Sequence, residues 1–314
     1  MKRIAAIIVA FTLIAASPAA FHWPLPQGVA PPAIPPDNPI SDAKIALGRR
    51  LFYDADLSVD GTMACATCHE QRRGFADGNV THAGVHGDPG RRNVPGLANV
   101  AWRRSLTWGD PRVTTLEQQV AIPLTGRFPV EMGMAGKEPE LRRRLGRDSC
   151  YRTMFRAAFP ETRGRIDQAS VAKALAAFQR TFVSFSAPID HGDAPAAGAA
   201  IFAAKCATCH AGHDFTDDQF HRLRQATSSD RGLGEVTGRI GDDGAFRTPS
   251  LRNVSVTGPW LHDGSATTLD QALMAHPNAD TADTPALIAF LAALTDNAFL
   301  TNPGLSYPDS ICRL

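Results

Sequence analysis

The sequence predicts a mainly α-helical protein whose core is completed by something other than its own side chains. Apolar residues recur at three- and four-residue intervals between residues 167 and 186, which is the spacing of one helix face. No segment shows a convincing alternation of apolar and polar residues, the pattern of a β-strand. The 314 residues include 26 glycines and 23 prolines but few aromatic side chains. We therefore expect short helices, joined by long loops, around bulky cofactors.

Local signals place the other helices. Ser41 is a suitable N-cap for a helix that reaches about Tyr53, and a proline-rich stretch before it, residues 21–40, predicts an extended arm. Further short helices are expected over residues 115–122, 138–147, 196–205, 268–276 and 285–295.

The first twenty residues have the pattern of a secretory signal peptide. Lys2 and Arg3 precede an apolar run that is too short to span a bilayer, and small residues follow up to Ala20. We therefore expect a signal peptide over 1–20 and a periplasmic chain with no membrane span after cleavage. An uncleaved N-terminal anchor is the alternative.

The charges of the chain nearly cancel, because 32 Lys and Arg residues face 31 Asp and Glu residues. This balance gives no electrostatic reason to expect binding to nucleic acid or to an anionic membrane surface.

The motif Cys-Ala-Thr-Cys-His occurs twice, at 65–69 and at 206–210. Two thiols three positions apart on a helical turn can bond to the two vinyl groups of one porphyrin, and the next residue then carries an imidazole below the iron. Zinc binding or redox thiols are the alternative for such spacing. Two copies in an exported chain predict two covalently bound haem c groups, attached through Cys65, Cys68, Cys206 and Cys209 with His69 and His210 as iron ligands.

One motif lies in each half of the chain, which suggests a duplicated haem-domain plan. A boundary near residue 190 gives an N-terminal haem domain over 21–190 and a C-terminal one over 191–314. The two cysteines outside the motifs, Cys150 and Cys312, are expected to form a disulfide in an oxidising compartment, and two free thiols are the alternative.

The residue opposite each proximal histidine decides the function, since a closed haem transfers electrons whereas an open haem can bind peroxide. For the second haem the candidates after His210 include Met274 and His276, which end a short helix and are better placed than the others, His213, His221 and His262. For the first haem, Glu131 lies in an apolar stretch where burial would raise its pKa and suit it to acid–base catalysis. An ion-paired or exposed glutamate is the alternative.

Taken together, these segments resemble the bacterial dihaem cytochrome c peroxidases and their MauG-like relatives. The resemblance rests on both Cys-x-x-Cys-His motifs and on residues 47–54, 92–95, 108, 129–132, 246–253 and 259–264, in family order. Residues 116–119 and 295–300 are most similar to the branch associated with methanobactin gene clusters, which oxidises a tryptophan of a partner protein.

The resemblance implies two cytochrome c-like domains packed around an interdomain calcium ion. It implies that the haem on His69 reacts with peroxide beside the catalytic Glu131 and the accompanying Gln119, while Trp108 relays electrons between the haems. The implied calcium ligands are Asn93 and Thr248, whose oxygen atoms suit a hard cation.

The chain departs from the family pattern at the second haem, where peroxidases carry methionine and MauG-like enzymes carry tyrosine as the distal ligand. The corresponding residue here is His276, and Met274 is the alternative. His86 falls where peroxidases place a histidine that blocks the first haem at rest, although we expect an open site.

The resemblance thus predicts an enzyme that uses hydrogen peroxide to oxidise a protein substrate, such as a tryptophan of a partner. One alternative is a cytochrome c peroxidase that takes electrons from a small cytochrome or cupredoxin. A second is a dihaem electron carrier.

Overall fold

The computed structural model describes residues 21–224 and 229–308. The predicted signal peptide and Cys312 lie outside the described residues, so the signal peptide and the disulfide with Cys150 remain predictions. Within the described part, no helix is long and apolar enough to cross a membrane.

The protein is mostly helical, as predicted, and its helices are short. They are α1 (Asp42–Phe52), α2 (Cys65–Cys68), α3 (Leu116–Thr125), α4 (Glu138–Arg147), α5 (Ser149–Ala158), α6 (Gln168–Gln179), α7 (Ala196–Lys205), α8 (Gly234–Thr237), α9 (Leu269–Met274), α10 (Thr284–Ala292) and α11 (Asn297–Leu300). Strands β1 (Phe220–Arg222) and β2 (Ala245–Arg247) form one antiparallel pair with His221 opposite Phe246. The sequence did not predict this pair, because three residues are too few to show an alternating pattern.

Most of the expected helices are present at the expected places. The hydroxyl of Ser41 caps α1, and α4 has the predicted bounds. The helix expected over 167–186 is shorter, since α6 ends at Gln179. Beyond it, the N–H groups of Thr181 and Phe182 bond to carbonyls three residues back, and the carbonyl of Phe182 accepts the N–H of Asn99 instead of continuing the helix.

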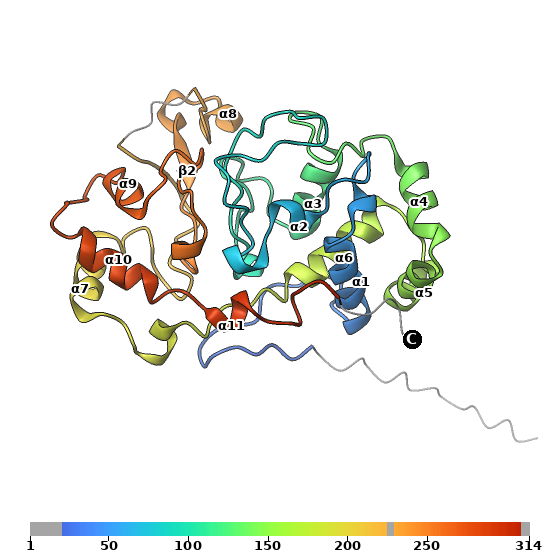
Figure 1. Ribbon diagram of the computed structural model, residues 1–314, viewed down its shortest axis with the longest axis horizontal. Coiled ribbons are helices and arrows are strands. Elements are labelled where there is room, and N and C mark those ends of the chain that lie inside the picture. The colour runs from blue at the N-terminus through green and yellow to red at the C-terminus, as the bar shows by residue number, and fades with distance from the viewer. Residues whose placement is uncertain (1–20, 225–228, 309–314) are drawn as a thin grey trace, which may run out of the picture.

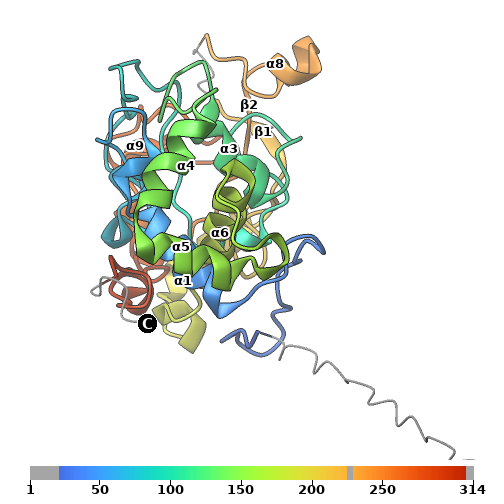
Figure 2. The ribbon, with the colours of Figure 1, turned by 90° about the vertical axis from the view of Figure 1, so that its right-hand side faces the viewer.

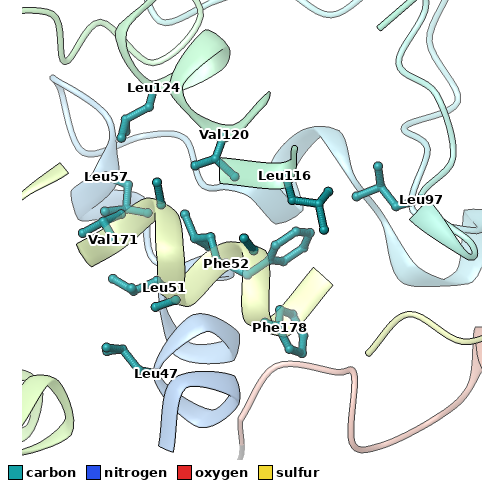
Figure 3. Packing of buried hydrophobic residues seen from close by; sticks show 14 of the residues in the cluster. Leu47, Leu51, Phe52, Leu57, Leu97, Leu116, Val120, Leu124, Val171 and Phe178 are labelled. Carbon is teal, nitrogen blue, oxygen red and sulfur yellow. The ribbon is translucent and has the colours of Figure 1, made fainter. Parts of the chain in front are cut away.

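The larger hydrophobic cluster surrounds the first haem motif. Figure 3 shows its centre, where Leu47, Leu51 and Phe52 of α1 pack against α3 and α6. Gly48 allows α1 to approach α6 closely, because a Cβ atom there would overlap the backbone carbonyl of Ala174. Figure 2 looks onto this side of the molecule, with α4 and α5 nearest the viewer.

A smaller hydrophobic cluster surrounds the second motif and lies on the left in Figure 1, among α7, α9 and α10. Its buried members are Phe202, Val254, Leu287, Phe290, Leu291 and Leu294. The presence of two clusters, each beside one motif, agrees with a duplicated plan.

The chain does not end within the smaller cluster. The segment after α11 returns towards α1 (Figure 1), and Phe299, Leu300 and Leu305 join the larger cluster. The C-terminal part of the expected second domain therefore packs on the first, while the division into two domains near residue 190 remains a prediction.

Replacing Phe155 of α5 by alanine should lower the free energy of unfolding by about 3–5 kcal/mol, because this fully buried ring packs against Tyr151 and Phe159 and its loss leaves a cavity. Denaturant titration of the haem-loaded protein measures the change. The control is Phe128→Ala, whose ring is 90% exposed and should change stability by less than about 0.5 kcal/mol. Equal losses in both variants would contradict the assigned core.

Candidate dihaem site

The first motif presents one histidine with a fixed tautomer. Helix α2 carries Cys65 and Cys68 on a single turn, and His69 follows directly. Nδ1 of His69 lies 2.6 Å from the carbonyl oxygen of Phe75, and burial lowers the pKa of this imidazole. A neutral ring that donates through Nδ1 keeps the Nε2 lone pair free to bind a metal.

The second motif repeats this arrangement. It follows α7, and Nδ1 of His210 lies 2.9 Å from the carbonyl oxygen of Phe215. Burial is the main reason that the pKa of His210 falls to about 4, so the ring is neutral over the physiological range. Both motifs are therefore prepared for metal binding in the same way.

A cavity of about 620 Å³ opens beside His210 and is bordered by Cys206, Cys209 and many apolar side chains. This volume is typical of sites that hold a cofactor. Two buried guanidinium groups, those of Arg103 and Arg247, also border it. Buried arginines suit the carboxylates of haem propionates. Arg103 and Arg247 already form ion pairs with Asp214 and Asp218, so the propionates would share the arginines with these aspartates. The residues present thus fit a haem.

His276 faces His210 across this cavity. The two ring centroids are 6.2 Å apart, and Nδ1 of His276 lies 2.9 Å from the carbonyl of Ala272, which leaves its Nε2 free. A metal-bound imidazole nitrogen lies about 2 Å from the metal, so two rings on opposite sides of one ion are separated by roughly 6 Å. Met274 is not among the described residues that border the cavity.

The other histidines considered for this haem differ in their contacts. His221 borders the cavity but bonds to Asp217 through Nε2 at 2.7 Å. His262 stacks on Phe246 with 3.5 Å between ring centroids, and its Nε2 is buried with no hydrogen-bond partner in the described part of the chain. That orphaned atom marks a place where the cofactor or water would supply a partner. His213, which the sequence ranked below His276, accepts a hydrogen bond from Arg252 through its backbone carbonyl.

Trp108 connects two segments that border the cavity, one at Asn93 and the other at Arg247. Its indole Nε1 donates to the carbonyl of Asn93 at 2.8 Å, and its own carbonyl accepts the N–H of Arg247 at 2.9 Å. Only 9% of this residue is exposed. It is buried at the wall of the cavity beside His210, and its position between two haems stays a prediction.

Asn93 and Thr248, the expected calcium ligands, are both buried and border the same cavity as Trp108. The amide nitrogen of Asn93 donates to the carbonyl of Asn79 at 2.9 Å, so its side-chain oxygen stays available. Oxygen atoms from two separate loops fit the ligand preference of calcium.

Glu131 lies on a segment that is fixed from two sides. The N–H groups of Met132 and Met134 bond to carbonyls in the last turns of α3, and the N–H of Val85 bonds to the carbonyl of Glu131 at 2.8 Å. Burial raises the pKa of the Glu131 carboxyl, and the charge of His82 opposes part of that rise. The carboxyl also contributes to raising the pKa of the Cys68 thiol, which places it near the first motif.

Gln119 lies half-buried on α3, the helix whose last turns hold the Glu131 segment. Helix α3 therefore carries Gln119 and also holds the segment of Glu131, the residue predicted to act with it. Within the described residues, no hydrogen bond of the Gln119 side chain defines its role.

The structure adds a histidine that the sequence did not single out. His86 is exposed, whereas His82 is half-buried, with its Nδ1 2.9 Å from a carboxylate oxygen of the buried Asp77. The charge of His82 affects the pKa of both His69 and Glu131, so His82 lies near both of them. Nothing in the local sequence distinguishes the two histidines, because both lie in the same glycine-rich loop.

The chain is similar to known proteins over most of its length. Residues 42–194 match a family described as di-haem cytochrome c peroxidase. The chain is 39% identical over 246 residues to methylamine utilization protein MauG of Methylophilus methylotrophus, an alignment that covers 74% of this chain and 71% of that protein. It is 33% identical to a cytochrome-c peroxidase of Denitromonas iodatirespirans, with 85% and 82% covered.

Solved structures agree. A MauG-like protein associated with microbial copper homeostasis superposes with a TM-score of 0.87 at 35% identity, covering 92% of this chain and 99% of that one. The diheme peroxidase BthA of Burkholderia thailandensis shares the fold, with a TM-score of 0.68 at 23% identity and coverage of 85% and 90%. The two haem motifs, their matched histidine geometry and these relatives show that the chain belongs to the di-haem cytochrome c peroxidase and MauG family and is a dihaem oxidoreductase.

Proposed function

We propose that this protein acts in the periplasm and uses hydrogen peroxide to oxidise a protein substrate. One observation carries the proposal: the two similar histidine sites differ in what faces them. His210 is opposed by a second imidazole at bonding separation, whereas the His69 motif has Glu131 nearby, a half-buried carboxyl whose pKa is raised by desolvation. A closed site and a site with an acid–base group suit a division between electron storage and peroxide chemistry.

At the first site, His69 would bind the haem iron through Nε2, and the bound haem supplies the redox chemistry of peroxide reduction. Glu131 accepts the proton of the near peroxide oxygen and delivers it to the far oxygen, which leaves as water. Its raised pKa brings proton uptake and release closer to neutral pH. Exposure of His86 supports a site that is open at rest.

At the second site, His210 and His276 would both hold the haem iron, which would then supply electron transfer rather than peroxide chemistry. Trp108 lies at the wall of this site and provides the aromatic connection towards the first. Asn93 and Thr248 would hold a calcium ion that fixes the loops on which Trp108 depends.

The similarity of this chain to MauG proteins supports a protein substrate. Identity to three of them is 39%, 38% and 32%, against 29–33% for the cytochrome c peroxidases among its relatives. The relative with a TM-score of 0.87 is associated with copper homeostasis. A partner protein in copper handling, oxidised at a tryptophan, is therefore the proposed substrate.

A cytochrome c peroxidase is the second candidate, because relatives of that name match 85–86% of the chain. It would take electrons from a small cytochrome or cupredoxin at the same two haems. A pure electron carrier is less well supported, since it gives Glu131 no role.

Incubation of the enzyme with peroxide and the protein encoded beside it should add oxygen to a tryptophan of that protein, as measured by peptide mass spectrometry. Enzyme without peroxide is the control. An unchanged partner mass, together with rapid oxidation of a reduced cytochrome, would support the peroxidase instead.

Replacing Glu131 by glutamine should slow peroxide turnover by a factor of about 100 or more, because glutamine cannot carry the proton. In the native enzyme the carboxylate form accepts the proton, so kcat/KM for peroxide should rise with pH through a pKa above the ordinary value of about 4.3. Stopped-flow kinetics across pH should show this limb in the native enzyme and not in the variant. Glu138→Gln, at an exposed position in α4, is the matched control. The same limb in both variants would remove Glu131 from the mechanism.

Replacing His276 by methionine should raise the reduction potential of the second haem, because a thioether favours reduced iron more than an imidazole does. Spectroelectrochemistry measures the potential, and electron paramagnetic resonance reports the ligands. Met274→Leu is the control and should change neither signal. A changed spectrum in the Met274 variant, with a native spectrum in the His276 variant, would exchange their roles.

A further inference from the structure

Aromatic rings form an unbroken contact from the first haem motif to the protein surface. The ring of His69 lies 6.4 Å from that of Phe52, which lies 5.4 Å from Tyr53, and Tyr53 lies 5.7 Å from Tyr307, all between ring centroids. Separations of about 4.5–7 Å are those of aromatic rings in direct contact. The chain of rings therefore begins at an iron ligand.

Exposure rises along this row of rings. Phe52 is 1% exposed, Tyr53 is half-buried, and Tyr307 is 65% exposed. Core packing accounts for Phe52 but not for Tyr307, whose ring is mostly in water. The row ends in a phenol that a second protein can touch.

Hydrogen bonds hold residues 305–307 so that the ring of Tyr307 contacts that of Tyr53. The Tyr53 hydroxyl donates to the carbonyl of Leu305 at 2.7 Å, and Arg49 Nε donates to the carbonyl of Ser306 at 2.7 Å. The Ser306 hydroxyl in turn donates to the side-chain oxygen of Gln71 at 2.8 Å. Gln71 follows the first haem motif, so the segment is tied both to α1 and to the haem-binding loop.

The two tyrosines differ in where a proton can go. The Tyr53 hydroxyl donates to a backbone carbonyl, which cannot accept a proton, and burial raises its pKa to about 12. Tyr307 is exposed, so water can take its proton when the ring loses an electron. Oxidation that starts at the haem would therefore come to rest on Tyr307, with Tyr53 and Phe52 as the bridge.

We propose that Tyr307 is a surface redox site through which the His69 centre oxidises aromatic side chains of a docked protein. This inference rests on the proposed function, which supplies peroxide as the oxidant. Each Tyr307 oxidation sends one electron inward and one proton to water. Two such electrons and two protons convert one hydrogen peroxide to two waters. The tyrosyl radical then regains an electron and a proton from a tyrosine or tryptophan of the partner.

The test uses the haem-loaded full chain with peroxide, a nitroso spin trap and no partner or reductant. The chain has three tyrosines, so peptide mapping can assign every tyrosine adduct. We expect trap adducts on the Tyr307 peptide, and a dityrosine-linked dimer when the trap is omitted. Tyr307→Phe should lose both products, and Tyr53→Phe should lower their yield.

Tyr151→Phe is the matched control, because Tyr151 is buried and its ring contacts Phe155, which does not belong to this row. It should form both products as the native protein does. Peroxide loss is followed in the same samples. Peroxide consumption without any Tyr307 product would overturn the inference and leave the proposed function standing. If peroxide is not consumed, the proposed function fails and the inference fails with it.

Discussion

The site depends on one hydrogen bond that occurs twice, from Nδ1 of the proximal histidine to the carbonyl of a phenylalanine. Both phenylalanines have left-handed backbones, with φ of 63° at Phe75 and 54° at Phe215, a conformation that costs a non-glycine residue about 1–2 kcal/mol. Packing offsets the cost, because the Phe75 ring stacks on Phe182 at 4.1 Å and the Phe215 ring meets Phe202 at 5.8 Å. The core thus fixes the tautomer of each iron ligand.

The scaffold around the two sites repeats as well. Asn99 and Asn253 are buried, have left-handed backbones, and donate their N–H groups to Phe182 and Leu294, which lie beyond α6 and α10. Their side chains meet at Ser184, where the Asn99 amide donates to its carbonyl at 3.1 Å and the Asn253 amide to its hydroxyl at 3.0 Å. One buried polar network therefore joins the two clusters, and the functional difference is left to the loops that face each haem.

The sequence predicted what local chemistry determines and missed what distant contacts determine. Both haem motifs and the helices capped by Ser41 and Thr268 follow from residues close together in the chain. The predicted end of α6 was wrong because the carbonyl of Phe182, beyond the helix, accepts the N–H of Asn99, which is far away in sequence. Buried Arg103 and Arg247 were missed since arginine is normally exposed, and only the fold places them at a cavity. His276 was predicted because it falls at the family's distal-ligand position, and its ring lies 6.2 Å from that of His210.

The fold separates the two ends of the first haem's chemistry. Glu131 is held by the end of α3 and by the loop at Val85, whereas the aromatic row leaves from His69 through α1. The returning C-terminal segment, which the sequence assigns to the other half, completes that row. In the proposed mechanism, this row would let a large protein substrate react at the surface, away from Glu131. In that mechanism the half-buried Glu131 carboxyl would serve peroxide, while the partner would contact only Tyr307 at the surface.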